Sequence, residues 1–167
     1  MMRIYVYILP LVLLIAACEP APRDIQFGQD ECAFCQMRVS DRAFATQLVT
    51  TQGRNFIFDS VECLAAHVER GDVAAENIHS IWVANFADPE GEPVDAESAI
   101  YLQSETLSSP MGLALSAYPD RATAEQHRDE YEGTLHDWSE VREIVRNSNM
   151  ISYHHHDLDD LEVTARH

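Results

Sequence analysis

The sequence has few basic residues and no hydrophobic run long enough to cross a membrane. Its 11 Lys and Arg are set against 28 Asp and Glu, which gives a formal net charge of −17. Binding to nucleic-acid phosphates needs a basic face, and this composition does not provide one. The apolar run at residues 4–15 is shorter than the roughly 20 residues of a membrane-spanning helix. We therefore expect no nucleic-acid partner and no transmembrane helix.

The first 17 residues have the features of a secretory signal peptide. Arg3 precedes the apolar run, and two small residues come directly before Cys18. Residues 15–18 are similar to the lipobox of bacterial lipoproteins, whose cysteine receives a diacylglycerol and becomes the new N-terminus. We expect Cys18 to be lipidated and the protein to face the periplasm. Glu19, rather than Asp, favours the outer membrane over the inner one by analogy with lipoprotein sorting.

The remaining cysteines are odd in number. With Cys18 assigned to lipid, the sequence leaves Cys32, Cys35 and Cys63. An exported protein meets oxidising conditions, so these residues are expected to be disulfides, metal ligands or protected thiols. At least one of the three thiols has no internal disulfide partner.

Two stretches of the chain repeat one order of elements. We predict strands at residues 43–50 and 55–58, a helix capped by Asp59 or Ser60 that stops at Gly71, and a strand at 79–86. The second stretch has predicted strands at 99–103 and 112–118, a helix from Asp120 to Gly133, a strand at 134–138 and a last helix at 139–147.

These patterns predict an α+β fold of two similar ββαβ units packed together, with antiparallel strands and one helix in each. A single mixed sheet with helices on one face is the alternative. The predicted segments are a signal peptide (1–17), a lipid-anchored linker with a cysteine-bearing loop (18–36), the first unit (37–88), the second unit with its terminal helix (89–147) and a disordered tail rich in His and Asp (148–167).

The strongest chemical signal is a group of sulfur side chains at residues 32–37. Two thiols, Cys32 and Cys35, are followed by the thioether of Met37. Both sulfurs of a C-x-x-C loop can converge on one ion, and thiolates are soft donors. A thioether is a poor ligand for zinc and a good one for copper(I), so Met37 would favour copper(I). A periplasmic C-x-x-C pair is also typical of a disulfide or redox pair, and the motif alone leaves this open.

Four further features offer metal donors. Met111 lies at the entrance of the matching strand of the second unit, where pseudo-symmetry can bring its thioether towards the first loop, although a core methionine fits equally. Cys63 and His67 are four residues apart on one helix face and can share a metal. A buried thiol with a hydrogen-bonded imidazole is the preferred interpretation of that pair. His136 is a candidate outer ligand, although a half-exposed strand histidine without a metal is the commoner case. The histidines at 154–156 can bind metal weakly and are not expected to form the main site.

Five segments in order resemble the NosL family. The resemblance covers residues 27–145 and follows the lipobox-like sequence. The segments are the C-x-x-C-x-Met loop at 32–37, Phe58-Asp59-Ser60-x-x-Cys63-Leu64, Trp82-Val83-Ala84-Asn85-Phe86, Ala99-Ile100-Tyr101 and Ser109-Pro110-Met111-Gly112.

This resemblance implies a copper(I)-binding lipoprotein that serves nitrous-oxide reductase, with two homologous ββαβ units similar to an organomercurial lyase domain. It places Cys35, Met37 and Met111 first as ligands and Cys32 next, ahead of the further candidates named above. The expected cargo is copper(I) for the catalytic copper–sulfide cluster of the reductase. The expected partner that receives it is the reductase itself or its copper-assembly machinery. We expect no enzymatic activity, because a shared fold does not transfer one.

Two other functions compete with copper delivery. One is a thiol–disulfide redox protein that uses Cys32 and Cys35. Such proteins usually place C-x-x-C at the start of a helix, whereas a hairpin is predicted to follow here. The other is a structural zinc site built from Cys32, Cys35, Cys63 and His67.

Overall fold

The structure is a computed structural model that describes residues 19–151. The predicted signal peptide, Cys18 and the histidines at 154–156 lie outside these residues. The first part of the chain forms β1 (Thr46–Thr50), β2 (Asn55–Phe58), α1 (Val61–Arg70), a 3-10 turn η1 (Ala75–Asn77), β3 (Ile78–Val83) and β4 (Val94–Asp95). The second part forms β5 (Ile100–Gln103), β6 (Leu115–Tyr118), α2 (Arg121–Tyr131), β7 (Thr134–His136) and α3 (Trp138–Asn147).

Each ββαβ unit builds its own antiparallel sheet. The first has the strand order β2-β1-β3-β4 and the second β6-β5-β7. In the first sheet the central strand β1 places Leu48 opposite Phe56 of β2 and Ile81 of β3. In the second sheet β5 is central and pairs with both β6 and β7. The predicted α+β fold of two ββαβ units is therefore confirmed.

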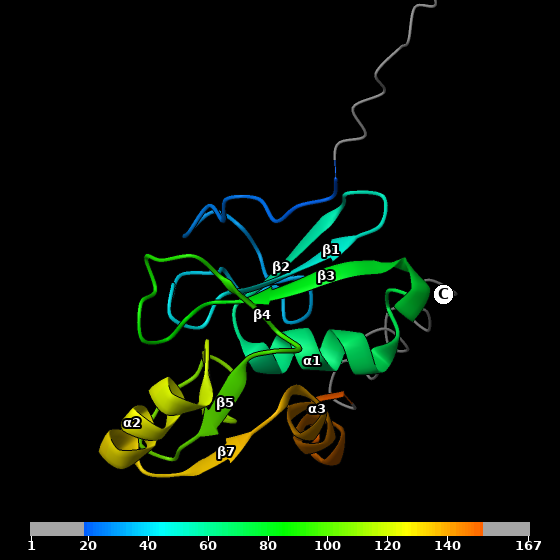
Figure 1. The fold of residues 1–167 in the computed structure, drawn as a ribbon. Coiled ribbons are helices and arrows are strands. Elements are labelled where there is room, and N and C mark those ends of the chain that lie inside the picture. Colours follow the sequence, from blue (N-terminus) through cyan, green and yellow to red (C-terminus); the bar gives the residue numbers. More distant parts are fainter. Residues whose placement is uncertain (1–18, 152–167) are drawn as a thin grey trace, which may run out of the picture.

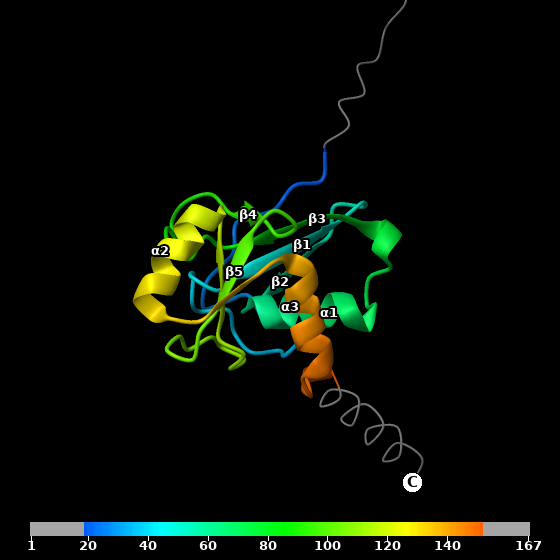
Figure 2. The same ribbon diagram turned by 60° about the horizontal axis from the view of Figure 1, so that its bottom comes forward.

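Helix α1 is the element that joins the two units. It lies against the first sheet, with α3 on its other side (Figures 1 and 2). It contacts β1 and β2 of its own unit, and β6 and α3 of the second part. The main core accordingly draws buried side chains from both units, whereas a smaller core lies between α2 and the second sheet. Residues at the start of α1 are thus held from both sides.

Local sequence signals fix the ends of the helices. Ser60 caps α1 by accepting a hydrogen bond from the backbone N–H of Cys63, and Gly71 ends the helix in the left-handed conformation, with φ of 74°. Asp120 caps α2 and Asp137 caps α3 in the same way. These caps depend on neighbouring residues alone, which explains why the sequence predicts the helices closely.

The structure corrects the predicted strand at 112–118. It begins only at Leu115, because Gly112 and Ala114 have φ values of 80° and 59°. Backbone in this left-handed region cannot continue a strand. Residues 109–114 instead form a loop in front of β6.

The strands predicted at 43–50, 79–86 and 134–138 are shorter in the structure, where they span Thr46–Thr50, Ile78–Val83 and Thr134–His136. Two further segments differ from the predicted division of the chain. The short strand β4 pairs with β3, so the first sheet extends beyond the predicted unit boundary at residue 88. Met150 and Ile151 are helical and pack against the main core, so residues 148–151 depart from the predicted disordered tail. Both segments are held by tertiary contacts, which local sequence patterns do not reveal.

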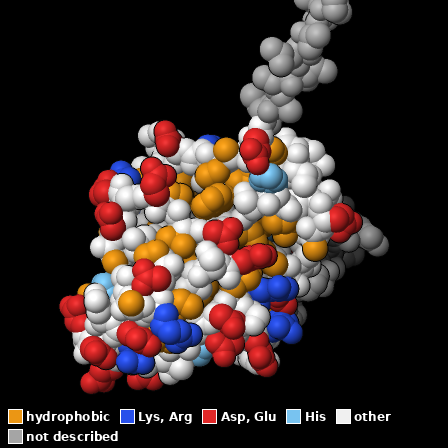
Figure 3. Space-filling model, viewed as in Figure 1, with side chains coloured by type: hydrophobic (Ala, Val, Ile, Leu, Met, Phe, Trp, Pro, Cys, Tyr) orange, Lys and Arg blue, Asp and Glu red, His pale blue; other side chains and the backbone are white. Residues whose placement is uncertain are grey.

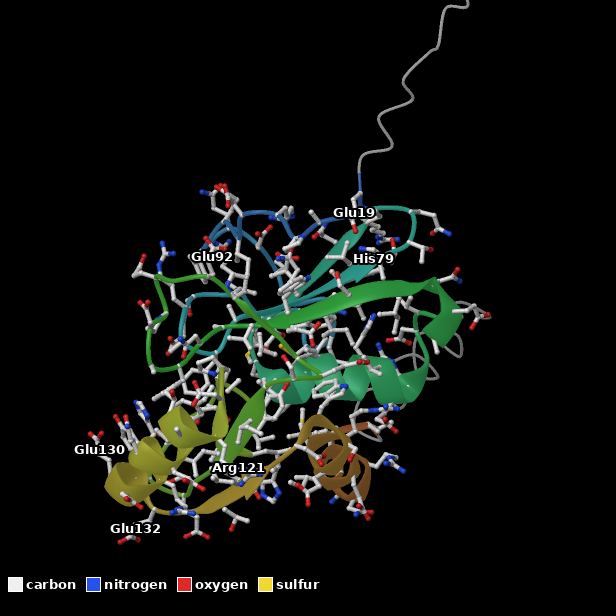
Figure 4. The ribbon with its side chains drawn as sticks, in the orientation of Figure 1. Glu19, His79, Glu92, Arg121, Glu130 and Glu132 are labelled. Atoms are coloured by element: carbon white, nitrogen blue, oxygen red, sulfur yellow. The ribbon has the colours of Figure 1, made fainter. Side chains whose placement is uncertain are left out.

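The two sheets lie on opposite sides of the domain. Glu19 and His79 lie on the side of the first sheet, whereas Glu130 in α2 and Glu132 after it lie on the opposite side (Figure 4). Acidic side chains spread over both halves of the face shown in Figure 3. Among residues 19–151, no helix combines the length and apolar character needed to cross a membrane.

Candidate metal site

Four side chains converge where α1 begins. One donor atom from each of Cys32, Cys35, Asp59 and Cys63 lies within 4.8 Å of the others. Two sulfurs on opposite sides of a single ion, with bonds of about 2.3 Å, stand about 4.6 Å apart. The spacing therefore suits one shared ion. We call these four residues the thiol cluster.

The C-x-x-C loop enters the cluster as a tight turn. The N–H of Cys32 donates to the carbonyl of Met37 at 2.7 Å, and the N–H of Gln36 donates to the carbonyl of Cys32 at 3.0 Å. Gln36 has a left-handed φ of 63°, which closes the turn. The N–H of Ala33 donates to the carbonyl of Ile57 at 2.8 Å and ties the loop to β2. This contact brings the loop beside the residues that follow β2.

The other two donors come from the junction between β2 and α1. Asp59 directly follows β2, Ser60 caps the helix, and Cys63 lies in the first helical turn. Because Ser60 provides the cap, the Asp59 carboxylate is free to face the thiols. Its Oδ2 lies 3.3 Å from the sulfur of Cys35. The partial positive charge of a helix N-terminus favours negative charge at this place.

Protons are shared unequally among the thiols. Hydrogen bonds from the thiols of Cys35 and Cys63 lower the pKa of Cys32 well below the ordinary thiol value. The hydrogen bond with Cys32 raises the pKa of Cys35 to about 12 and also raises the pKa of Cys63. Burial and then the charge on Cys32 raise the pKa of Asp59. One thiolate thus lies beside two thiols whose protons a bound cation can replace.

Burial separates the three sulfurs. Cys32 and Cys63 are 2% and 0% exposed, whereas Cys35 is only partly buried. All three are free thiols in the structure. The cluster is therefore reached from the side of Cys35.

The two methionines have different surroundings. Met37 follows the tight turn, and at 46% exposed it is the large hydrophobic side chain most open to solvent among residues 19–151. Met111 is partly buried and packs against the main core, which also contains Cys32 and Cys63. Their roles as ligands remain predictions.

The two candidate histidines lie outside the thiol cluster. His67 is buried between the rings of Phe56 and Phe58, with centroid distances of 5.2 and 5.0 Å. Its Nδ1 lies 3.0 Å from Asp72 Oδ2, and burial lowers its pKa. His136 on β7 lies near Glu140. Cys63 therefore points to the other thiols while His67, one helical turn later, faces aromatic rings.

Asp59 is the member of the cluster that the sequence does not single out as a donor. In the sequence it is a candidate helix cap, a role that Ser60 fills. A usable signal is its position four residues before Cys63, directly before the capping residue. A carboxylate beside a serine cap is not required by the helix and can face a ligand.

The fold and the cluster define a class of small α+β domains, with two ββαβ units and a group of thiols where the first helix begins. A family model described as NosL matches residues 24–145. The chain belongs to the NosL family.

The fold is similar to that of a solved structure. This is the crystal structure of the copper chaperone NosL from Shewanella denitrificans, which is 18% identical in sequence and has a TM-score of 0.59. The similarity covers 72% of this chain and 96% of that chain. No curated protein matches the sequence.

Proposed function

We propose that this protein binds copper(I) as cargo at the thiol cluster and delivers it for assembly of the catalytic copper–sulfide cluster of nitrous-oxide reductase. The observation that carries the proposal is the convergence of three thiols and Asp59 within 4.8 Å. Sulfur donors of this kind favour copper(I). Membership of the NosL family and the copper chaperone among its structural neighbours support the same function.

The cluster has properties that suit both retention and release. Cys32 offers a thiolate, and the buried Cys63 holds the far side of the ion away from water. Cys35 is partly exposed, so a partner's sulfur can approach and displace it. The exposed thioether of Met37, two residues later, offers a weaker soft donor at the same edge. A ligand exchange of this kind passes the ion on without releasing it.

Zinc is the second candidate cargo, because three thiolates and one carboxylate oxygen also suit that ion. A redox role has less support. The C-x-x-C loop closes as a turn that is tied to β2, whereas thiol–disulfide redox proteins usually place this motif at the start of a helix.

Metal selectivity tests the cargo. The reduced protein, offered equal amounts of copper(I) and zinc(II), should retain about one copper(I), because its donors are mostly soft sulfur. Elemental analysis gives the metal, and X-ray absorption at the copper edge gives the sulfur ligands. Retention of zinc in preference to copper(I) would reassign the site to the second candidate.

Delivery is tested in cells. A strain without this protein should still export nitrous-oxide reductase, but the enzyme should lack copper at its catalytic cluster when copper is scarce. Added copper should partly restore it. Complementation with Cys35→Ser should fail, whereas His136→Gln, outside the thiol cluster, should restore copper content and activity. A fully loaded reductase in the deletion strain at limiting copper would rule out this recipient.

We also propose that Cys18 carries the lipid that holds the protein on the periplasmic side of a membrane, with the outer membrane favoured. The described residues begin at Glu19, which lies on the side of the domain that the first sheet forms (Figure 4). Replacing Cys18 with Ser should release the protein from the membrane fraction while copper(I) binding persists. Mass spectrometry of the membrane-extracted protein checks the modification, and an unmodified Cys18 would contradict it.

A further inference from the structure

Glu62 is a buried acidic residue beside the thiol cluster. It precedes Cys63 in the first turn of α1, and its side chain is 0% exposed. Burying a carboxyl group is costly unless it forms hydrogen bonds. Burial accordingly raises the pKa of Glu62. An apolar side chain would fill this place without that cost, so the partners of the carboxyl group indicate its role.

One oxygen of the Glu62 carboxyl group, Oε1, accepts hydrogen bonds from two residues of the second unit. The hydroxyl of Ser109 donates to Glu62 Oε1, and the N–H of Leu115 donates to the same oxygen at 3.5 Å. Ser109 and Leu115 stand at the two ends of the loop in front of β6. One carboxyl oxygen therefore holds both ends of this loop against α1.

The loop is also closed on itself. The N–H of Ala114 donates to the Ser109 hydroxyl at 2.9 Å, and the N–H of Gly112 donates to the Ser109 carbonyl at 3.1 Å. Met111 lies near the middle of this closed loop. The hydroxyl of Ser109 thus links the inner hydrogen bonds of the loop to Glu62.

These contacts connect Cys63, a member of the thiol cluster, with Met111, a candidate donor that is far away in the sequence. Cys63 follows Glu62 in α1, and Met111 packs against the core that contains Cys32 and Cys63. The position of a metal donor relative to its partners determines how well they share an ion. A residue that fixes the loop to the helix therefore fixes Met111 relative to the thiols.

We propose that Glu62, through Ser109, is a positioning residue that holds the Met111 loop in place for copper(I) binding. The inference rests on the proposed copper function. Glu62 does not contact the ion itself. Its hydrogen bonds hold the loop that carries the thioether beside the helix that carries a thiol.

A double-mutant cycle in the full-length protein tests this role. Copper(I) affinity is measured by competition with a chromophoric copper(I) chelator for the parent, Ser109→Ala, Met111→Leu and the double variant. Ser109→Ala should weaken binding by about 10-fold to 100-fold, the usual range for partners that orient a ligand. In the Met111→Leu background the same change should have less than about a 2-fold effect, because no thioether is left to position.

The control is a buried serine of the same unit. Ser116 is 0% exposed, and its hydroxyl bonds to Leu102 and Tyr118 rather than to Glu62. Ser116→Ala should leave copper(I) affinity unchanged. Glu62→Gln keeps a carbonyl oxygen for Ser109 and should bind within about 3-fold of the parent, whereas Glu62→Leu should lose affinity as Ser109→Ala does.

Three results of the affinity measurements overturn the proposal. They are equal losses from Ser109→Ala with and without the Met111 sulfur, no loss from Ser109→Ala, and no loss from Met111→Leu. Amide hydrogen exchange without copper tests the positioning of the loop independently of copper(I) binding. The amides of Ala114 and Leu115 should exchange at least about 10-fold faster in Ser109→Ala than in the parent. Faster exchange in a protein that binds no copper(I) contradicts the proposed function, and unchanged exchange contradicts the positioning role.

Discussion

Replacing Cys63 with Ser should weaken copper(I) binding by more than about 100-fold, because loss of a direct ligand should exceed the 10-fold to 100-fold loss typical of groups that only orient one. Cys63 is fully buried, and its sulfur lies within 4.8 Å of the other donors of the thiol cluster. Serine keeps the shape of the side chain and replaces the soft sulfur with a hard oxygen. Competition with a copper(I) chelator measures the change.

The matched control for this variant is Ala66→Ser. Ala66 is also fully buried in α1, so the change adds a similar buried hydroxyl and leaves every sulfur in place. Thermal unfolding without copper should show comparable losses of stability for both variants. Copper(I) affinity should fall only for Cys63→Ser. If Cys63→Ser binds copper(I) as tightly as the parent, Cys63 is a core residue and not a ligand, as its position in the sequence suggests.

Replacing Gly133 with Ala should destabilise the second unit by about 4 kcal/mol or more, which is among the large effects of single substitutions. Gly133 has φ of 122° and directly precedes β7. An added Cβ would overlap the carbonyl oxygen of Gln103 and lie 3.0 Å from its carbonyl carbon. Both atoms belong to the backbone of β5, where Gln103 is paired with Thr134 of β7. Movement of a side chain therefore cannot relieve the overlap.

Gly53→Ala separates this overlap from the cost of the backbone conformation. Gly53 has φ of 79° in the turn between β1 and β2, and an added Cβ would meet no atom within 4 Å. That variant should cost only about 1–2 kcal/mol. Thermal or denaturant unfolding provides the comparison, and similar losses in the two variants would show that contact with β5 contributes little.

Elements that depend on neighbouring residues could be predicted well. Ser60 and Gly71 mark the ends of α1 as expected, and Asp120 begins α2. Elements that depend on distant contacts could not. The two-residue strand β4 exists because β3 offers it a partner, and it is too short to show an alternating pattern.

The candidate site divides in the same way. The Cys32 and Cys35 pair is visible in the sequence because its two sulfurs lie on one loop. The position of Cys63 on α1 gives no sign that the loop packs against the first helical turn, which depends on the contact between Ala33 and Ile57. The spacing of Cys63 and His67 indicates a shared face, yet their side chains meet different neighbours, because a helical turn separates them along the axis.

The unequal burial of the three thiols has a kinetic consequence. An ion bound to Cys32, Cys35 and Cys63 would be covered on two sides, so its escape into water would be slow. An incoming sulfur that attacks beside Cys35 would replace that ligand first, and the ion would then leave through the same opening. The residence time of copper(I) would thus be long in the isolated protein and short once a recipient has docked. If the protein delivers copper(I) as proposed, its equilibrium affinity alone would not predict how fast it passes the ion on.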